Sequence, residues 1–173
     1  MNTKTPTIYI IDDDKEVCDA LRWLFESVLL TVESYTNPRQ FLANYTPQNQ
    51  GCLIMDVRMP EMSGLQLLEH LNLQKNRLPV IVITGHQDIP SAIRAMKLGA
   101  SDFILKPLHE QDFLEIVQKN IDNAISQSNV LEVLDKIRER INSLSPRERQ
   151  VIDLLLEGKL NKEIAYEIGR AHV

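Results

Sequence analysis

Short apolar runs alternate along the chain with longer segments in which apolar residues recur every three or four positions. The short runs are rich in β-branched residues, as is typical of buried strands, and the longer segments have the spacing of amphipathic helices. The pattern predicts five strands that alternate with five helices. The expected strands are 7–11, 30–35, 52–55, 79–83 and 103–105, and the expected helices lie near 17–28, 38–45, 65–71, 89–98 and 110–125.

This alternation favours an α/β fold with a five-stranded, doubly wound parallel sheet. In such folds the ligand site lies beyond the carboxyl ends of the strands, where the strand order reverses. Polar residues follow four of the expected strands: Asp12 and Asp13 the first, Asp56 the third, Thr84 the fourth and Lys106 the fifth. We therefore expect these five side chains to meet at one edge of the sheet.

Converging carboxylates repel one another unless a cation neutralises them, and Mg²⁺ is the expected cation because it prefers carboxylate and water oxygens. An Asp carboxylate can then act as a nucleophile toward phosphorus. Lys106 and the Thr84 hydroxyl are suited to stabilise the charge that spreads over the phosphoryl oxygens. Asp56 is the predicted nucleophile because it alone ends the central strand. Each of these residues would by itself fit a turn or cap, so the prediction depends on their joint occurrence.

The segment after residue 125 has a different pattern. Val130, Leu134, Ile137 and Ile141 recur at spacings of four and three in a heptad-like stripe. The stripe predicts an amphipathic linker helix over 126–144, which either packs on its neighbours or dimerises. The sequence leaves both alternatives open.

A new helical unit is expected to begin at Ser145. Ser145 and Glu148 form a capping-box pattern with proline at the first helical position, and Gly158 is expected to close that helix. Asn161 is expected to cap a second short helix, which Gly169 should end.

Charge is distributed unevenly along the 173 residues. The net charge is −5, and residues 1–122 hold 16 acidic against 11 basic residues, whereas the remainder is balanced. Phosphate contacts need Lys and Arg, so only the C-terminal part is a candidate for contact with DNA.

Composition also bears on location. No apolar run approaches the roughly 20 residues that span a bilayer, and the N-terminus has no apolar signal segment. We therefore expect a cytoplasmic protein without a membrane partner. Cys18 and Cys52 are expected to be buried, reduced thiols because neither belongs to a CxxC pair.

Five motifs occur in the order in which receiver domains of two-component response regulators carry them. They are 10–14 (IIDDD), 55–60 (MDVRMP), Gly64, 84–86 (TGH) and the pair Lys106-Pro107. Residues 6–122 resemble these receiver domains, and the stretch 83–107 is most similar to the FixJ subgroup. The resemblance implies a flavodoxin-like receiver fold.

The resemblance also implies roles for the acidic residues. Asp56 would accept a phosphoryl group from the phosphohistidine of a sensor histidine kinase. Asp12 and Asp13 would form the acidic pocket, and Mg²⁺ would be held there with Asp56 and the backbone carbonyl of Arg58. The chain would catalyse only its own phosphorylation and dephosphorylation, so no further enzyme activity is expected.

A switch follows from the same resemblance. Thr84 and Lys106 would contact the phosphoryl group, Phe103 matches the switch aromatic, and the Lys106-Pro107 peptide bond would be cis. Phosphorylation would rearrange the surface of the fourth helix, fifth strand and fifth helix, which then forms a homodimer. The candidate apolar contacts of this surface are Ile89, Ile93, Met96 and Leu108. The alternative is that these residues pack into the core.

Residues 144–169 are similar to the opening of a LuxR-type helix-turn-helix domain. The predicted organisation is a receiver over 1–122, a linker helix over 123–143 and an incomplete DNA-binding domain over 144–173. Residues 170–173 do not match the start of a recognition helix, the element that reads bases, so sequence-specific DNA binding by this chain is not expected. The predicted function is phosphorelay-controlled transcription regulation. The alternative is a receiver module that signals through protein contacts.

Two other function classes fit less well. Haloacid-dehalogenase-type phosphatases have a second Asp two residues after the nucleophile, where this chain has Arg58. Nucleotide and flavin binders need a glycine-rich turn after the first strand, where this chain has three consecutive Asp residues at 12–14.

Overall fold

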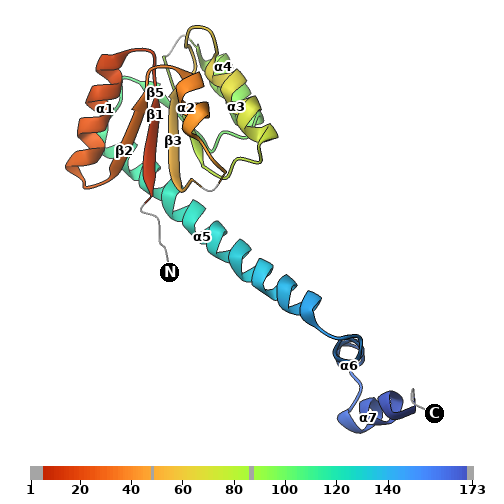
Figure 1. Ribbon diagram of the computed structural model, residues 1–173. Helices are drawn as coiled ribbons and strands as arrows, with labels where there is room; N and C mark the ends of the chain where they lie inside the picture. The colour runs from red at the N-terminus through yellow and green to blue at the C-terminus, as the bar shows by residue number, and fades with distance from the viewer. Residues whose placement is uncertain (1–5, 48, 86–87, 171–173) are drawn as a thin grey trace. The chain divides into compact units, whose positions relative to one another are not determined.

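A five-stranded parallel sheet forms the centre of the N-terminal part of the chain (Figure 1). The computed structural model describes residues 6–47, 49–85 and 88–170. The strands follow the order β2-β1-β3-β4-β5, which confirms the doubly wound, flavodoxin-like fold. Their bounds are β1 Thr7–Ile11, β2 Thr31–Tyr35, β3 Gly51–Asp56, β4 Val80–Gly85 and β5 Asp102–Lys106.

Helices cover both faces of this sheet. Residues of α1 and α5 pack on one face, and residues of α2, α3 and α4 pack on the other. The bounds are α1 Lys15–Ser27, α2 Pro38–Asn44, α3 Gly64–Leu73, α4 Ile89–Lys97 and α5 Glu110–Ser143.

The two-residue period of the strands divides the core. Ile8 and Ile10 point toward the face that also holds Phe25 of α1 and Phe113 of α5, whose rings lie 5.3 Å apart. The alternate residues, including Ile11, point toward the opposite cluster. Because both faces of β1, β3 and β4 are buried, these strands are almost continuously apolar, which is why the sequence indicates them so clearly.

Side chains cap the first turns of several helices. Asn37 accepts a hydrogen bond from the Arg39 amide at 2.7 Å, with Pro38 at the first helical position of α2. Asp14 caps α1 by accepting from the Glu16 amide at 2.8 Å. The predicted Ser145 capping box is also present at the start of α6.

The helices expected near 110–125 and over 126–144 are both present, but they are not separate. A single 34-residue helix, α5, covers the whole stretch. The physical reason is that residues 110–143 contain no Gly or Pro to end a helix after Ile125.

Two helices follow α5, namely α6 Pro146–Leu156 and α7 Asn161–Arg170. Gly158 separates them with a φ of +78°, as predicted. Asn161 is the first residue of α7 instead of its cap, and α7 continues through Gly169 as far as it is described. Interior glycine costs a helix only about 1 kcal/mol, so it does not force an end.

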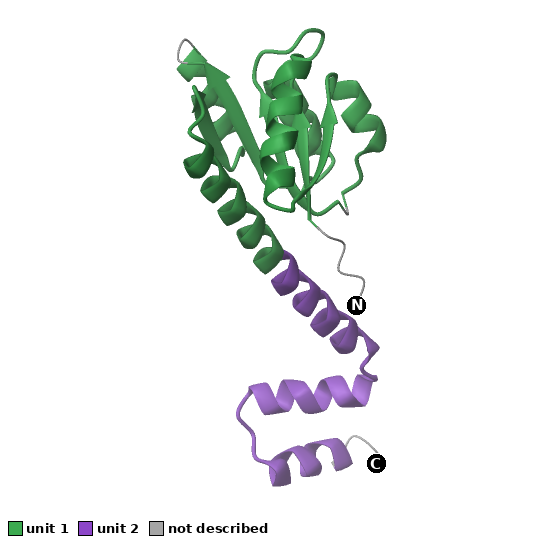
Figure 2. Cartoon of the chain, turned by 90° about the vertical axis from the view of Figure 1, so that its left-hand side faces the viewer, with its two compact units in different colours: residues 1–127 green, residues 128–173 purple. Residues whose placement is uncertain are grey.

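The chain divides into two compact units, residues 1–127 and 128–173, and the division falls within α5 (Figure 2). Cys18 and Cys52 are buried free thiols, as expected. Within the described ranges no helix combines the length and apolar character that a membrane crossing requires.

Candidate functional site

The sheet topology brings the first and third strand ends together. β1 pairs with both β2 and β3, so the strand order reverses between β1 and β3. Ile11 lies opposite Met55 in this ladder, which places the next residues, Asp12 and Asp56, beside each other at the carboxyl edge. This is the edge at which a doubly wound fold binds its ligand.

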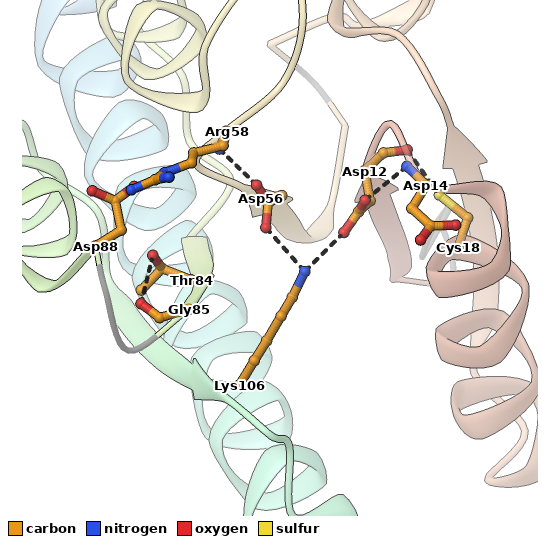
Figure 3. A network of polar contacts seen from close by, with 9 residues as sticks. All are labelled: Asp12, Asp14, Cys18, Asp56, Arg58, Thr84, Gly85, Asp88 and Lys106. Atoms are coloured by element: carbon orange, nitrogen blue, oxygen red, sulfur yellow. Dashed lines mark hydrogen bonds and ion pairs between the residues drawn. The ribbon is translucent and has the colours of Figure 1, made fainter.

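One ammonium group joins the two carboxylates. Lys106 Nζ lies 3.1 Å from Asp56 Oδ1 and 3.4 Å from Asp12 Oδ2 (Figure 3). Lys106 ends β5, and 50 residues separate it from Asp56 in the sequence. The prediction that these strand ends converge is confirmed for these three side chains, which we call the acidic site.

Asp12 is the most buried member of the acidic site, with an exposed fraction of 4%. Burial raises the pKa of its carboxyl group, the nearby charge of Asp56 raises it further, and the Asp14 amide and Lys106 oppose the shift. The Asp14 amide donates to Asp12 Oδ1 at 2.9 Å. The charge of the buried Asp12 carboxylate is therefore not fully compensated by the protein alone, which is the condition that favours a bound cation.

The pKa of Lys106 shifts in a direction that keeps it charged. Partial burial acts to lower the pKa, but the hydrogen bond and charge of Asp56, followed by those of Asp12, raise it overall. Lys106 is thus a permanent positive charge against Asp56 at neutral pH.

The loop after β3 shapes the surroundings of Asp56. The Arg58 amide donates to Asp56 Oδ2 at 2.6 Å, so one carboxylate oxygen faces the loop backbone and the other faces Lys106. Gly64 closes this loop by donating its amide to Val57 O at 2.9 Å. A Cβ at Gly64 would lie 2.4 Å from Asp56 O, so only glycine fits this close approach.

Thr84 lies at the end of β4 with an exposed fraction of 2%. Its hydroxyl donates to Gly85 O at 3.5 Å, the outer limit for a hydrogen bond, so this contact is weak. The hydroxyl is therefore available to a stronger acceptor. His86, the last residue of the predicted TGH motif, lies outside the described residues.

Asp13 is exposed, unlike Asp12. Within the described ranges, no three His, Cys, Asp or Glu side chains are close enough to hold a metal ion together. The donors at this edge are instead the two carboxylates of the acidic site, with Asp13 and backbone oxygens next to them in sequence. A small hard cation that keeps several waters, such as Mg²⁺, fits this oxygen-rich set.

The predicted switch surface is partly exposed. Ile89, Ile93 and Met96 of α4 have exposed fractions of 42%, 50% and 38%. Leu108, in contrast, packs against the core on the α1–α5 side, and Phe103 packs against the core on the other side. The Lys106-Pro107 peptide bond is cis, as predicted.

An ion pair beside the acidic site was not predicted from the sequence. Arg58 Nε donates to Asp88 Oδ2 at 2.7 Å, and Ser91 Oγ donates to Asp88 Oδ1 at 2.7 Å. Thirty positions separate Arg58 from Asp88, so no local pattern could have indicated the pair.

Two matches to known families cover most of the chain. Residues 8–118 match the response regulator receiver domain, and residues 142–171 match the bacterial regulatory proteins of the LuxR family. The chain is 41% identical to the transcriptional regulatory protein FixJ of Azorhizobium caulinodans, over 94% of this chain and 77% of that protein. It is 40% identical to the response regulator protein TodT of Pseudomonas putida, over 97% of this chain and 74% of that protein.

Solved structures show the same likeness. The response regulator StyR superposes with a TM-score of 0.88 at 38% identity, covering 96% of this chain and 84% of that one. Full-length FixJ from B. japonicum superposes with a TM-score of 0.70 at 38% identity, covering 95% of this chain and 81% of that one.

Proposed function

The chain belongs to the response regulators, as a FixJ-like transcription regulator with a receiver domain and a LuxR-type DNA-binding domain, and we propose that Asp56 is its phosphoacceptor. The observation that carries the proposal is the position of Asp56, whose carboxylate ends the central strand and lies 3.1 Å from the Lys106 ammonium. The proposed donor is the phosphohistidine of a sensor histidine kinase.

The proposed reaction uses the acidic site directly. An Asp56 carboxylate oxygen attacks the phosphorus atom, an acyl phosphate bond forms, and the bond to the donor nitrogen breaks. Lys106 would hold one phosphoryl oxygen by charge, and the Thr84 hydroxyl would donate to another. Asp12, Asp13, Asp56 and the Arg58 carbonyl would hold Mg²⁺, which supplies positive charge for the phosphoryl oxygens.

The consequence of phosphorylation would appear on α4. A phosphoryl group adds negative charge and three acceptor oxygens, so it would draw the weakly bonded Thr84 hydroxyl toward Asp56. Movement of Thr84 and Phe103 would then change the surface that carries Ile89, Ile93 and Met96. We propose that this apolar surface pairs with a second copy, because buried apolar area stabilises association.

The C-terminal unit would connect the switch to DNA. α6 and α7 lie within the segment that matches the LuxR family, residues 142–171, and would carry the DNA contacts of the chain. The second candidate function is a receiver module that signals through protein contacts, which the exposed Ile89, Ile93 and Met96 of α4 favour.

The decisive measurement is the intact-protein mass after incubation with acetyl phosphate, with and without Mg²⁺. We expect one phosphoryl adduct that requires Mg²⁺ and is released by hydroxylamine, because acyl phosphates are labile to it. Asp56→Asn keeps the size of the side chain but removes its charge, and should show no adduct. Asp102→Asn is the matched control because Asp102 is the first residue of β5, whereas the acidic site lies at the carboxyl ends of the strands.

Each outcome has a distinct meaning. An adduct that persists in Asp56→Asn would show that another residue is the acceptor. No adduct in the unaltered chain would contradict the phosphorylation chemistry and favour the interaction module.

A further inference from the structure

The Arg58–Asp88 ion pair links the loop after β3 to the start of α4. Asp88 immediately precedes α4, and within the described residues its side chain does not cap the helix backbone. Its two oxygens instead accept from Arg58 Nε and Ser91 Oγ, both at 2.7 Å. Asp88 thus ties the first turn of α4 to the loop that carries Arg58.

Arg58 is also tied to the proposed phosphoacceptor. Its amide donates to Asp56 Oδ2 at 2.6 Å, while its guanidinium extends away toward Asp88 (Figure 3). The backbone of Arg58 is therefore bonded to Asp56, and its guanidinium is bonded to Asp88.

Phosphorylation of Asp56 would change this balance. Asp88 offers the guanidinium a single negative charge, whereas an acyl phosphate offers up to two and three acceptor oxygens. Arginine binds such oxygens in bidentate geometry, which strengthens the contact.

The guanidinium is not held in place by packing. The Arg58 side chain is 69% exposed. Arg58 and Asp88 both line an open groove of about 510 Å³, so the guanidinium can leave Asp88 without unpacking the core.

We propose that Arg58 is an exchangeable clamp, which pairs with Asp88 in the unphosphorylated chain and moves to the phosphoryl group on Asp56. The exchange has two effects. It retains the phosphoryl group by adding a positive charge beside Lys106, and it releases the N-terminus of α4, the helix that carries Ile89, Ile93 and Met96. This inference rests on the proposed role of Asp56.

The test is the half-life of the phosphorylated chain after acetyl phosphate is removed, measured by intact mass in the presence of Mg²⁺. Asp88→Asn frees Arg58 for the phosphoryl group and should lengthen the half-life. Arg58→Gln removes the clamp and should shorten it. Each change should be roughly two- to fivefold, the range that an exposed charge pair supports. The double variant should behave as Arg58→Gln, because Asp88 acts only through Arg58.

A second ion pair provides the matched control. Arg39 and Glu61 also join a helix to the loop after β3, with 3.6 Å between Nε and Oε2 and with both side chains exposed. Arg39→Gln and Glu61→Gln should leave the half-life unchanged. Thermal unfolding of every variant checks that the fold is retained, as expected for exposed positions.

The outcomes separate the clamp from the proposed function. Half-lives that shift in the same direction in Asp88→Asn and Arg58→Gln, or that match those of the controls, would overturn the clamp while Asp56 remains the acceptor. Absence of any adduct in the unaltered chain would overturn the role of Asp56, and the clamp with it.

Discussion

At the scale of residues, burial of the charged Asp12 carboxylate in the acidic site reduces the stability of the fold. Asp12 has an exposed fraction of 4%, and the pKa of its carboxyl group is raised, chiefly because burial disfavours the charged form. A group whose pKa is raised by folding holds its proton more tightly in the folded chain, so its charged form reduces stability. The charge that would bind a cation at this site therefore lowers the free energy of unfolding of the metal-free chain.

Asp12→Asn should therefore stabilise the metal-free chain near neutral pH, because the amide keeps the shape of the side chain and removes the buried charge. The gain in stability of Asp12→Asn over the wild type should be full above the raised pKa of Asp12. It should shrink as the pH falls toward 3.8, the ordinary pKa of an Asp carboxyl group, because the folded wild type is then protonated at Asp12. Urea unfolding at several pH values, with a chelator present, measures the difference. A variant less stable than wild type at pH 7 would contradict this account.

Magnesium should make the wild type more stable than Asp12→Asn. A ligand that binds only the folded state raises stability by an amount that grows with the logarithm of its concentration relative to its dissociation constant, and Asp12 is a proposed ligand for the ion. Addition of Mg²⁺ should raise the melting temperature of the wild type more than that of Asp12→Asn. Ca²⁺ and a matched concentration of NaCl are the controls for ion identity and ionic strength. Equal shifts in the two proteins would exclude Asp12 from the metal site.

At the scale of elements, the loop between β3 and α3 has little steric freedom. Gly64 begins α3 and approaches the backbone of Asp56 so closely that a Cβ would lie 2.4 Å from the Asp56 carbonyl oxygen. The same loop presents the Arg58 amide to the carboxylate of Asp56 at 2.6 Å. The start of a helix is thereby coupled to the geometry of the proposed phosphoacceptor.

Gly64→Ala should reduce the free energy of unfolding by about 1–3 kcal/mol, the usual cost of an added group in a packed site. It should also slow phosphoryl uptake, since the displaced loop no longer holds Asp56 in place. Chemical denaturation and the acetyl phosphate assay measure the two effects. Gly85→Ala is the control because a Cβ there meets nothing within 4 Å. Equal stability of the two variants would show that the loop can yield.

At the scale of the whole molecule, the hydrophobic core is concentrated in the first unit. Among the described residues, the buried apolar side chains beyond residue 127 are Leu154 and Ile164 alone. In the same segment α5 leaves Val130, Leu134, Ile137 and Ile141 about half exposed. Because burial of apolar area stabilises local structure, residues 128–173 should open far more readily than the sheet.

Hydrogen exchange of the intact chain, followed by mass spectrometry, tests this difference. Peptides from β1, β3 and β4 should exchange slowest, since both faces of these central strands are buried. Peptides from residues 128–170 should exchange faster by orders of magnitude, as expected for helices with few buried contacts. Protection of α6 and α7 that equals that of the sheet would show stabilising contacts beyond those within this unit.

The sequence by itself determined the order and type of the elements in residues 7–106, the capping box at Ser145, and the strand ends that carry Asp12, Asp56, Thr84 and Lys106. These follow from local patterns, because apolar spacing, capping residues and β-branched runs act over a few positions. The rule for parallel sheets then predicted which strand ends converge.

Only the tertiary structure decided the contacts that depend on distant segments. It placed the Lys106 ammonium between two carboxylates, buried Asp12 but left Asp13 exposed, and paired Arg58 with Asp88. It also joined the expected fifth helix and linker into one α5, because no residue between them ends a helix. The burial of a side chain and its charge partner depend on packing across the sheet. Apolar spacing and capping residues act over a few positions, so they do not determine either one.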